Sequence, residues 1–108
     1  DTLALEEICL GAHGWVAGLV DAFPRETVAI WELAQAGKLN EARSIYRWFM
    51  PLLELDIHPK LVQYIKLAAQ ETGIGSEWVR PPRLPLEGEE RTRVLSIIRN
   101  AIANRPVI

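Results

Sequence analysis

The sequence predicts an α/β fold, in a chain that is itself mostly α-helical. Residues 15–20 form a short apolar run between glycines, which is typical of a strand buried on both faces in a parallel sheet covered by helices. The rest of the chain has helical periodicity, so it supplies no parallel neighbour for that strand. The sequence also begins at Asp1 without a Met. We therefore expect a truncated or cleaved piece of a larger α/β protein.

Composition indicates a globular chain without a charge bias. Hydrophobic residues make up 49% of the 108 residues, which is enough for a packed core. The 12 basic and 14 acidic residues give a net charge of −2, so charge does not support nucleic-acid binding. No apolar run approaches the roughly 20 residues of a membrane span, so we expect no membrane partner. A single cysteine excludes an internal disulfide and fits a reducing compartment, so we expect a cytoplasmic protein.

The first two predicted elements are a short helix and the buried strand. Residues 2–10 have apolar positions at helical spacing and are followed by a glycine. Cys9 falls on the apolar face of this helix, where it would be a small buried hydrophobe. In the strand at 15–20, Val16 and Gly18 share one face because successive side chains alternate.

Helices follow the strand. Residues 24–36 begin with a proline, which suits the first turn of a helix, and are followed by Gly37, which suits a left-handed C-terminal cap. Residues 79–86 contain three prolines and predict an extended connector. Residues 87–104 have the amphipathic spacing of a final helix.

Two further helices are expected between these segments. Asn40 can cap the first of them, and Pro51 is expected to kink or split it because proline removes one helical hydrogen bond. Pro59 can start the second helix, and Gly73 ends it.

Several short motifs occur in order along the chain. They are Gly-Ala-His-Gly and Asp-Ala-Phe-Pro on either side of the strand, Gly-x-x-x-x-Ala-Arg at 37–43, Met-Pro-Leu at 50–52, Lys66 followed by Gly73, and Val-Arg-Pro-Pro with Pro-Leu across 79–86. In order and spacing, this series resembles the C-terminal part of the dihydrodipicolinate synthase / N-acetylneuraminate lyase family. The resemblance covers nearly the whole chain.

The resemblance implies a (β/α)8 TIM barrel, which needs roughly 250 residues, followed by a C-terminal helical extension. Residues 1–37 would be the end of the barrel: the seventh helix, the eighth strand and the eighth helix. Residues 38–108 would form the C-terminal helical extension. The rest of the barrel would lie upstream of this chain.

The resemblance also implies class I, Schiff-base chemistry of a lyase or aldolase, a dehydratase or a deaminase. The substrate would be pyruvate, another 2-oxo acid or a cyclic imino acid. A lysine would form the imine, whose protonated nitrogen acts as an electron sink, and a tyrosine would shuttle protons. The lysines present, Lys38, Lys60 and Lys66, fall in predicted helices or at their ends. We therefore expect the catalytic lysine upstream, no catalytic residue and no cofactor here, and no activity from this segment alone.

By the same resemblance, Asp1, Val16 and Gly18 are candidate substrate-binding residues, since the active sites of such barrels lie at the C-terminal ends of strands. Asp1 matches an acidic residue that contacts substrate hydroxyls in the lyase branch, with a helix-dipole role as an equal alternative. Val16 matches a position that faces the bound acid, and it would pack in the barrel core in either case. Gly18 leaves space for a close approach.

Other polar residues do not add a site. Asp21 stands where the family usually has Asn, and a carboxylate only accepts hydrogen bonds whereas an amide also donates. His13, His58 and Cys9 share no ligand spacing, so no metal site is expected.

The implied partners are a small 2-oxo acid, the rest of the barrel and copies of the same chain in a dimer or homotetramer. The C-terminal helices carry more apolar residues than one layer against a barrel needs, which favours an interface: Trp48, Phe49, Ile97, Ile98 and Ile102. The alternative is a non-catalytic helical protein-interaction module. The strand at 15–20 discriminates between them, because a helical module has no use for it.

Overall fold

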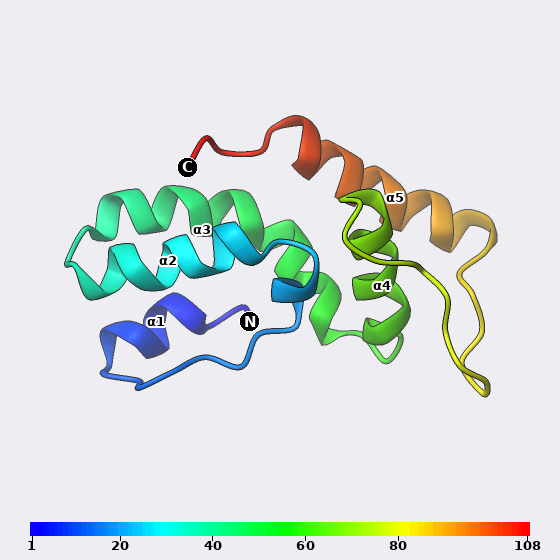
Figure 1. The fold of residues 1–108 in the computed structure, drawn as a ribbon, viewed down its shortest axis with the longest axis horizontal. Helices are drawn as coiled ribbons and strands as arrows, with labels where there is room; N and C mark the ends of the chain where they lie inside the picture. The colour runs from blue at the N-terminus through cyan, green and yellow to red at the C-terminus, as the bar shows by residue number, and fades with distance from the viewer.

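The computed structural model describes residues 1–108 as a set of helices without any β-strand. The elements in chain order are α1 (Ala4–Cys9), the 3-10 helix η1 (Leu19–Asp21), α2 (Pro24–Gln35), α3 (Leu39–Leu53), the 3-10 helix η2 (Glu54–Ile57), α4 (Leu61–Glu71) and α5 (Gly88–Ala103). Figure 1 shows α1, α2 and α3 grouped at one end and α4 and α5 at the other. The second half of α3 and η2 join the two groups.

The predicted strand at residues 15–20 is wrong for this chain. Residues 15–17 have no regular structure, and η1 begins at Leu19. A strand is stable only when a neighbour accepts and donates its backbone hydrogen bonds, and residues 1–108 contain no other strand to do so. In Figure 1 the segment is a blue coil that runs back beneath α1 to η1.

The predicted helices are present, with boundaries shifted by a few residues. Gly37 and Gly73 follow α2 and α4 with positive φ angles of 76° and 81°, as expected for left-handed caps. The cap predicted at Asn40 is wrong, because α3 begins at Leu39, which places Asn40 inside the helix and Lys38 at the cap position. Pro51 does not split α3, since it lies in the last turn, just before the chain tightens into η2.

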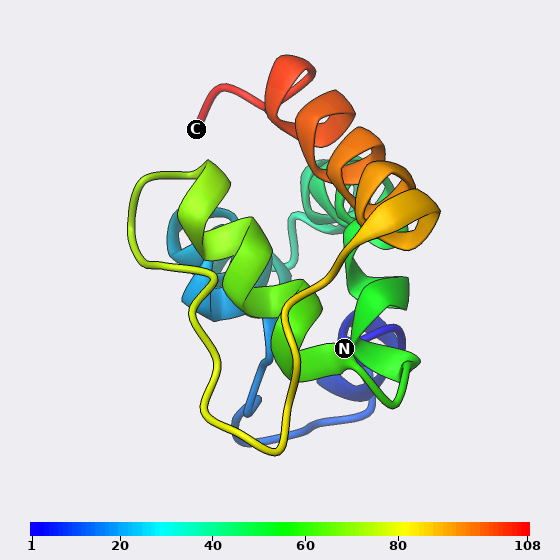
Figure 2. The same cartoon turned by 90° about the vertical axis from the view of Figure 1, so that its right-hand side faces the viewer.

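The predicted connector is also confirmed as irregular chain. Residues 79–86 contain neither helix nor strand. Figure 2 shows this segment as a yellow loop that reaches outside α4 before α5 begins.

A core of 22 buried residues runs through both groups of helices, and aromatic side chains form its centre. Phe23 is fully buried and meets Trp48 and Phe49 edge-on, with ring centroids 5.7 Å apart in each pair. The indole Nε1 of Trp48 donates to the carbonyl of Ala101 at 2.9 Å, which attaches α5 to α3. α3 therefore packs against α1, α2, η2 and α5.

Three predictions of burial need correction. Cys9 is exposed, because α1 buries Ala4 and Ile8 and the next residue lies about 100° further round the helix. Phe49 and Ile98, expected at a subunit interface, are fully buried within this chain. On α3 and α5, their partly buried neighbours are the apolar residues left to contribute to such an interface.

An ion pair fastens the end of the chain to the start of α2. Arg105 donates from Nε to Oε1 of Glu26 at 2.6 Å and from Nη2 to Oε2 at 3.2 Å. Its guanidinium carbon lies 5.2 Å from the centroid of the Phe23 ring. The Glu26 side chain is only 3% exposed, whereas that of Arg105 is 33% exposed. The carboxylate therefore depends on this one partner.

We expect Arg105→Leu to lower the free energy of unfolding by about 2 kcal/mol, because the Glu26 carboxylate would stay buried without its counter-charge. The partial exposure of the arginine keeps the loss below that of a fully buried pair. Urea unfolding of the complete protein measures this change in the free energy of unfolding. Arg99→Leu is the matched control: it breaks a pair with Glu71 in which the arginine is 64% exposed, and its expected cost is below about 1 kcal/mol. Equal losses in the two variants would contradict the assignment.

Candidate functional site

Of the three candidate substrate-binding residues, the structure brings Asp1 and Gly18 together and leaves Val16 apart. Oδ2 of Asp1 accepts the backbone N–H of Gly18 at 3.0 Å and that of Leu19 at 3.1 Å. Oδ1 of Asp1 accepts the indole N–H of Trp15 at 2.9 Å. Val16 is fully exposed, so it does not pack in a core within this chain.

The path of the chain after α1 explains why Asp1 lies beside Gly18. A turn after α1, with Gly11 at a φ of 96°, reverses the chain so that residues 12–17 return toward the N-terminus, which lies beside η1 in Figure 1. The first N–H groups of a helical turn have no acceptor within the helix. The Asp1 carboxylate supplies one for η1, and a negative charge is favourable there.

Gly18 is held on its other side by close packing. A Cβ added at Gly18 would lie 2.5 Å from Oδ1 of Asp56 and 3.0 Å from Cδ1 of Ile65. The backbone of Gly18 is ordinary, with φ −83° and ψ −50°, so its conformation does not require glycine. The absence of a side chain is what lets η1 approach η2 and α4. In this chain, the space above Gly18 is therefore filled by protein.

Residues 13–20 have an apolar and open surface on the side that faces α2. Side chains of the segment and of α2 line a hollow of about 370 Å³: His13, Trp15, Ala17, Val20, Thr27, Val28 and Trp31, together with Gly14. Val28 is 49% exposed. The lining contains no carboxylate or lysine, and His13 is its one titratable side chain, so most of the hollow is suited to contact with apolar groups.

The three lysines lie on helices or beside their first residues, as expected. Lys60 is paired through Nζ with Oε1 of Glu90 at 2.7 Å, and the hydroxyl of Tyr64 donates to the other carboxylate oxygen at 2.7 Å. The bond to Glu90 raises the pKa of Lys60. The same two bonds lower the pKa of Glu90. A lysine held protonated in this way is a poor nucleophile.

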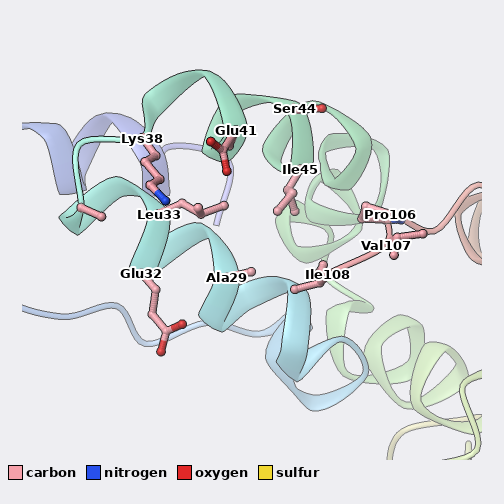
Figure 3. A pocket seen from close by; sticks show the side chains of 11 residues that line it. Ala29, Glu32, Leu33, Lys38, Glu41, Ser44, Ile45, Pro106, Val107 and Ile108 are labelled. Atoms are coloured by element: carbon pink, nitrogen blue, oxygen red, sulfur yellow. The ribbon is translucent and has the colours of Figure 1, made fainter.

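Lys38 borders a second cavity, between α2, α3 and the C-terminal tail. The cavity measures about 540 Å³. Figure 3 shows Lys38, Glu32 and Glu41 around its rim and the last three residues along one side. Glu32, Lys38, Glu41 and Ser44 are the polar residues of a lining that is otherwise apolar in its side chains.

Tyr46 is the most strongly perturbed tyrosine, and its contacts are structural. Burial, followed by a hydrogen bond to Glu6, raises its pKa to about 12. Its single hydroxyl hydrogen lies between the Glu6 carboxylate and the carbonyl of Thr2. These contacts hold α1 and the residues before it against α3.

The residues of this chain form neither a metal site nor a membrane span. No group of three or more His, Cys, Asp or Glu residues is arranged to hold a metal ion. None of the helices has both the length and the apolar character needed to cross a membrane.

Trp15 and Asp56 belong to the site, and sequence reasoning missed both. Trp15 lies in the predicted strand, where alternation places it on the face opposite Gly18. Asp56 lies in the turn after α3, and no local pattern links that turn to Gly18. The signal available for Trp15 was its indole donor, which usually finds a partner when buried.

Comparison with known proteins identifies the class. A family model described as the dihydrodipicolinate synthetase family matches residues 1–101. A 4-hydroxy-tetrahydrodipicolinate synthase of Thermomicrobium roseum is 33% identical, over 91% of this chain and 32% of that protein. The synthase of Pelodictyon phaeoclathratiforme is 30% identical over 84% of this chain and 31% of that protein, and the synthase of an Escherichia coli strain is 29% identical over 94% and 35%.

The chain belongs to the dihydrodipicolinate synthetase family, which confirms the resemblance seen in the motifs. It spans about a third of the length of the relatives that it matches. Its mostly helical structure is consistent with a C-terminal segment of such a protein.

We expect Gly18→Ala to lower the free energy of unfolding by about 1 kcal/mol, because an inserted methyl group forces packed neighbours apart. Asp56→Ala removes the nearest obstructing atom, so the alanine at position 18 should be better tolerated in that background. A double-mutant cycle by urea unfolding of the complete protein measures the coupling. Additive effects of the two substitutions, or a Gly18→Ala variant more stable than the parent, would contradict the packing described.

Proposed function

We propose that this chain is the C-terminal third of a class I, Schiff-base enzyme. The enzyme would be a lyase or aldolase, a dehydratase or a deaminase, acting on pyruvate, another 2-oxo acid or a cyclic imino acid. The family match over residues 1–101 is the observation that carries the proposal. The synthase names of the aligned relatives support it.

In this proposal residues 1–37 complete a (β/α)8 barrel and residues 38–108 form its helical extension. The apolar hollow beside the 15–20 segment supports this, since such a surface suits cover by other parts of a protein. Leu10 and Val16, both exposed, lie in the chain between α1 and η1, close to this hollow in sequence. Strands from the upstream part would give residues 15–17 the backbone partners that they lack here, up to Gly18 and Leu19, whose N–H groups Asp1 accepts.

The chemistry would be divided between the two parts of the enzyme. An upstream lysine would attack the carbonyl carbon of the 2-oxo acid, and loss of water would give the imine. Asp1, Val16 and Gly18 would lie beside the bound substrate without a bond-making role. Lys60 is held in an ion pair with Glu90 and is therefore a poor candidate for the nucleophile, which supports an upstream position for that residue.

The complete enzyme would assemble as a dimer or homotetramer in the cytoplasm. Apolar side chains at the far end of the helical extension support an interface, since Ile74, Trp78 and Leu84 are each more than half exposed. All three lie in the irregular chain between α4 and α5, and exposed apolar groups of this size favour association.

We expect the complete protein to sediment as a dimer or tetramer at micromolar concentration. Trp78→Ser should weaken that assembly because it removes an aromatic contact of the kind that dominates interfaces. Arg43→Ser, an exposed position on α3, is the control. Sedimentation of the parent as a monomer would contradict the assembly proposed.

The alternative function is a helical interaction module without catalysis. It is favoured by one observation: residues 1–108 form a packed helical core without a strand. The two functions differ in whether an imine forms on the complete protein.

We expect borohydride reduction in the presence of pyruvate to label the complete enzyme on one lysine outside residues 1–108, because only an imine is reduced to a stable secondary amine. Peptide mapping locates the label. Variants with Lys38→Arg, Lys60→Arg or Lys66→Arg should be labelled as the parent is. A label on any of these three lysines would contradict the proposal that the imine-forming lysine lies upstream. Absence of labelling with pyruvate and other 2-oxo acids would favour the interaction module.

A further inference from the structure

We propose that Asp1 is a positioning residue: its carboxylate fixes the 15–19 segment that borders the substrate in the enzyme proposed above. The inference rests on that proposed function for its consequence, but its structural basis lies wholly within this chain. It assigns Asp1 a role different from direct contact with substrate hydroxyls.

Hydrogen bonds from three points of the segment converge on this one carboxylate. Oδ1 accepts the indole N–H of Trp15 at 2.9 Å, and Oδ2 accepts the consecutive backbone N–H groups of Gly18 and Leu19 at 3.0 and 3.1 Å. A carboxylate offers about four lone-pair sites. The three donors occupy most of them, so little capacity is left for a ligand.

These bonds restrain a stretch that has no regular structure of its own. Residues 15–17 lie outside any helix, so their path depends on side-chain contacts. Asp1 holds one side of the segment, while Asp56 and Ile65 pack closely over Gly18 on the other. Loss of the carboxylate would release the segment on one side only, and the helices would keep their core.

The donor set requires a charged acceptor. Hydrogen bonds to an ionised carboxylate are roughly twice as strong as neutral ones. An asparagine of nearly the same shape has one acceptor oxygen, and its NH₂ group would face an N–H donor. Asp1→Asn therefore breaks a positioning role, whereas an amide could still hydrogen-bond a substrate hydroxyl.

Pyruvate separates the two roles, because it carries no hydroxyl group. The experiment uses the complete enzyme and follows its inactivation by cyanoborohydride at increasing pyruvate concentration. It yields a maximal rate of imine trapping and a half-saturating pyruvate concentration. The variants are Asp1→Asn, Trp15→Phe and their combination, with Trp31→Phe as the matched control, since Trp31 lines the same hollow but makes no bond to Asp1.

We expect Asp1→Asn to lower the maximal trapping rate roughly tenfold, since misplacement of about 1 Å can cost on the order of 100-fold. Trp15→Phe should lower it less, and the double variant should resemble Asp1→Asn because both changes act through one set of bonds. Trp31→Phe should trap like the parent. Unchanged trapping of pyruvate by Asp1→Asn would overturn the proposal and return Asp1 to a hydroxyl-contacting role.

A spectroscopic measurement tests the bond itself. In protein labelled with fluorotryptophan, the Trp15 resonance is assigned by its loss in Trp15→Phe. It should shift in Asp1→Asn and stay in place in Trp31→Phe, and a resonance that does not shift in Asp1→Asn would overturn the proposal. Failure of the parent to trap any 2-oxo acid would contradict the proposed function instead, while the shift of the Trp15 resonance would still support the positioning role of Asp1.

Discussion

Burial of Phe23 is the constraint on which the arrangement of the molecule depends. Its ring is fully enclosed, with Trp48 and Phe49 of α3 at its edges and the guanidinium of Arg105 over it. The residue stands between η1 and α2 in the chain. Because its ring cannot move without opening the core, the end of η1 is fixed relative to α3 and to the C-terminal tail.

The 15–19 segment is therefore irregular in structure but held at several points. Phe23 anchors the chain after it, the Asp1 carboxylate binds its backbone, and the missing side chain at Gly18 lets it pack against η2 and α4. Its remaining side, toward Val28 and Trp31, is apolar and open. The segment is therefore packed against the helical extension on one side and leaves an apolar surface open on the other, as expected of one part of a longer family member.

The helices could be predicted because their signals are local. Gly37 and Gly73 mark helix ends through their own backbone freedom, and Pro24 marks a start through its fixed φ. The strand predicted at 15–20 could not be tested by local signals. A strand forms only when it pairs with other strands, and a short stretch of sequence does not show whether those strands are present. Cys9 was misplaced by a single position on a short helix, where one residue separates the buried face from the exposed one.

The site was predicted in part, and for a different reason from the one the structure provides. The family motifs drew attention to Asp1 and Gly18, which do meet. Their meeting depends on the turn at residues 11–14, and the contact of Gly18 with Asp56 depends on how η1 sits against η2. Such contacts between distant parts of the chain follow from the packed fold and leave no periodic signal.

Amide hydrogen exchange of the complete protein tests most directly whether residues 15–20 complete a barrel in the longer enzyme. Amides paired in a central sheet open only with large-scale unfolding, whereas those of exposed loops exchange freely. We expect the amides of residues 15–17, which lie before the two amides that Asp1 already binds, to exchange as slowly as those in the middle of α3. Exchange as fast as that of the connector at 79–86 would contradict it.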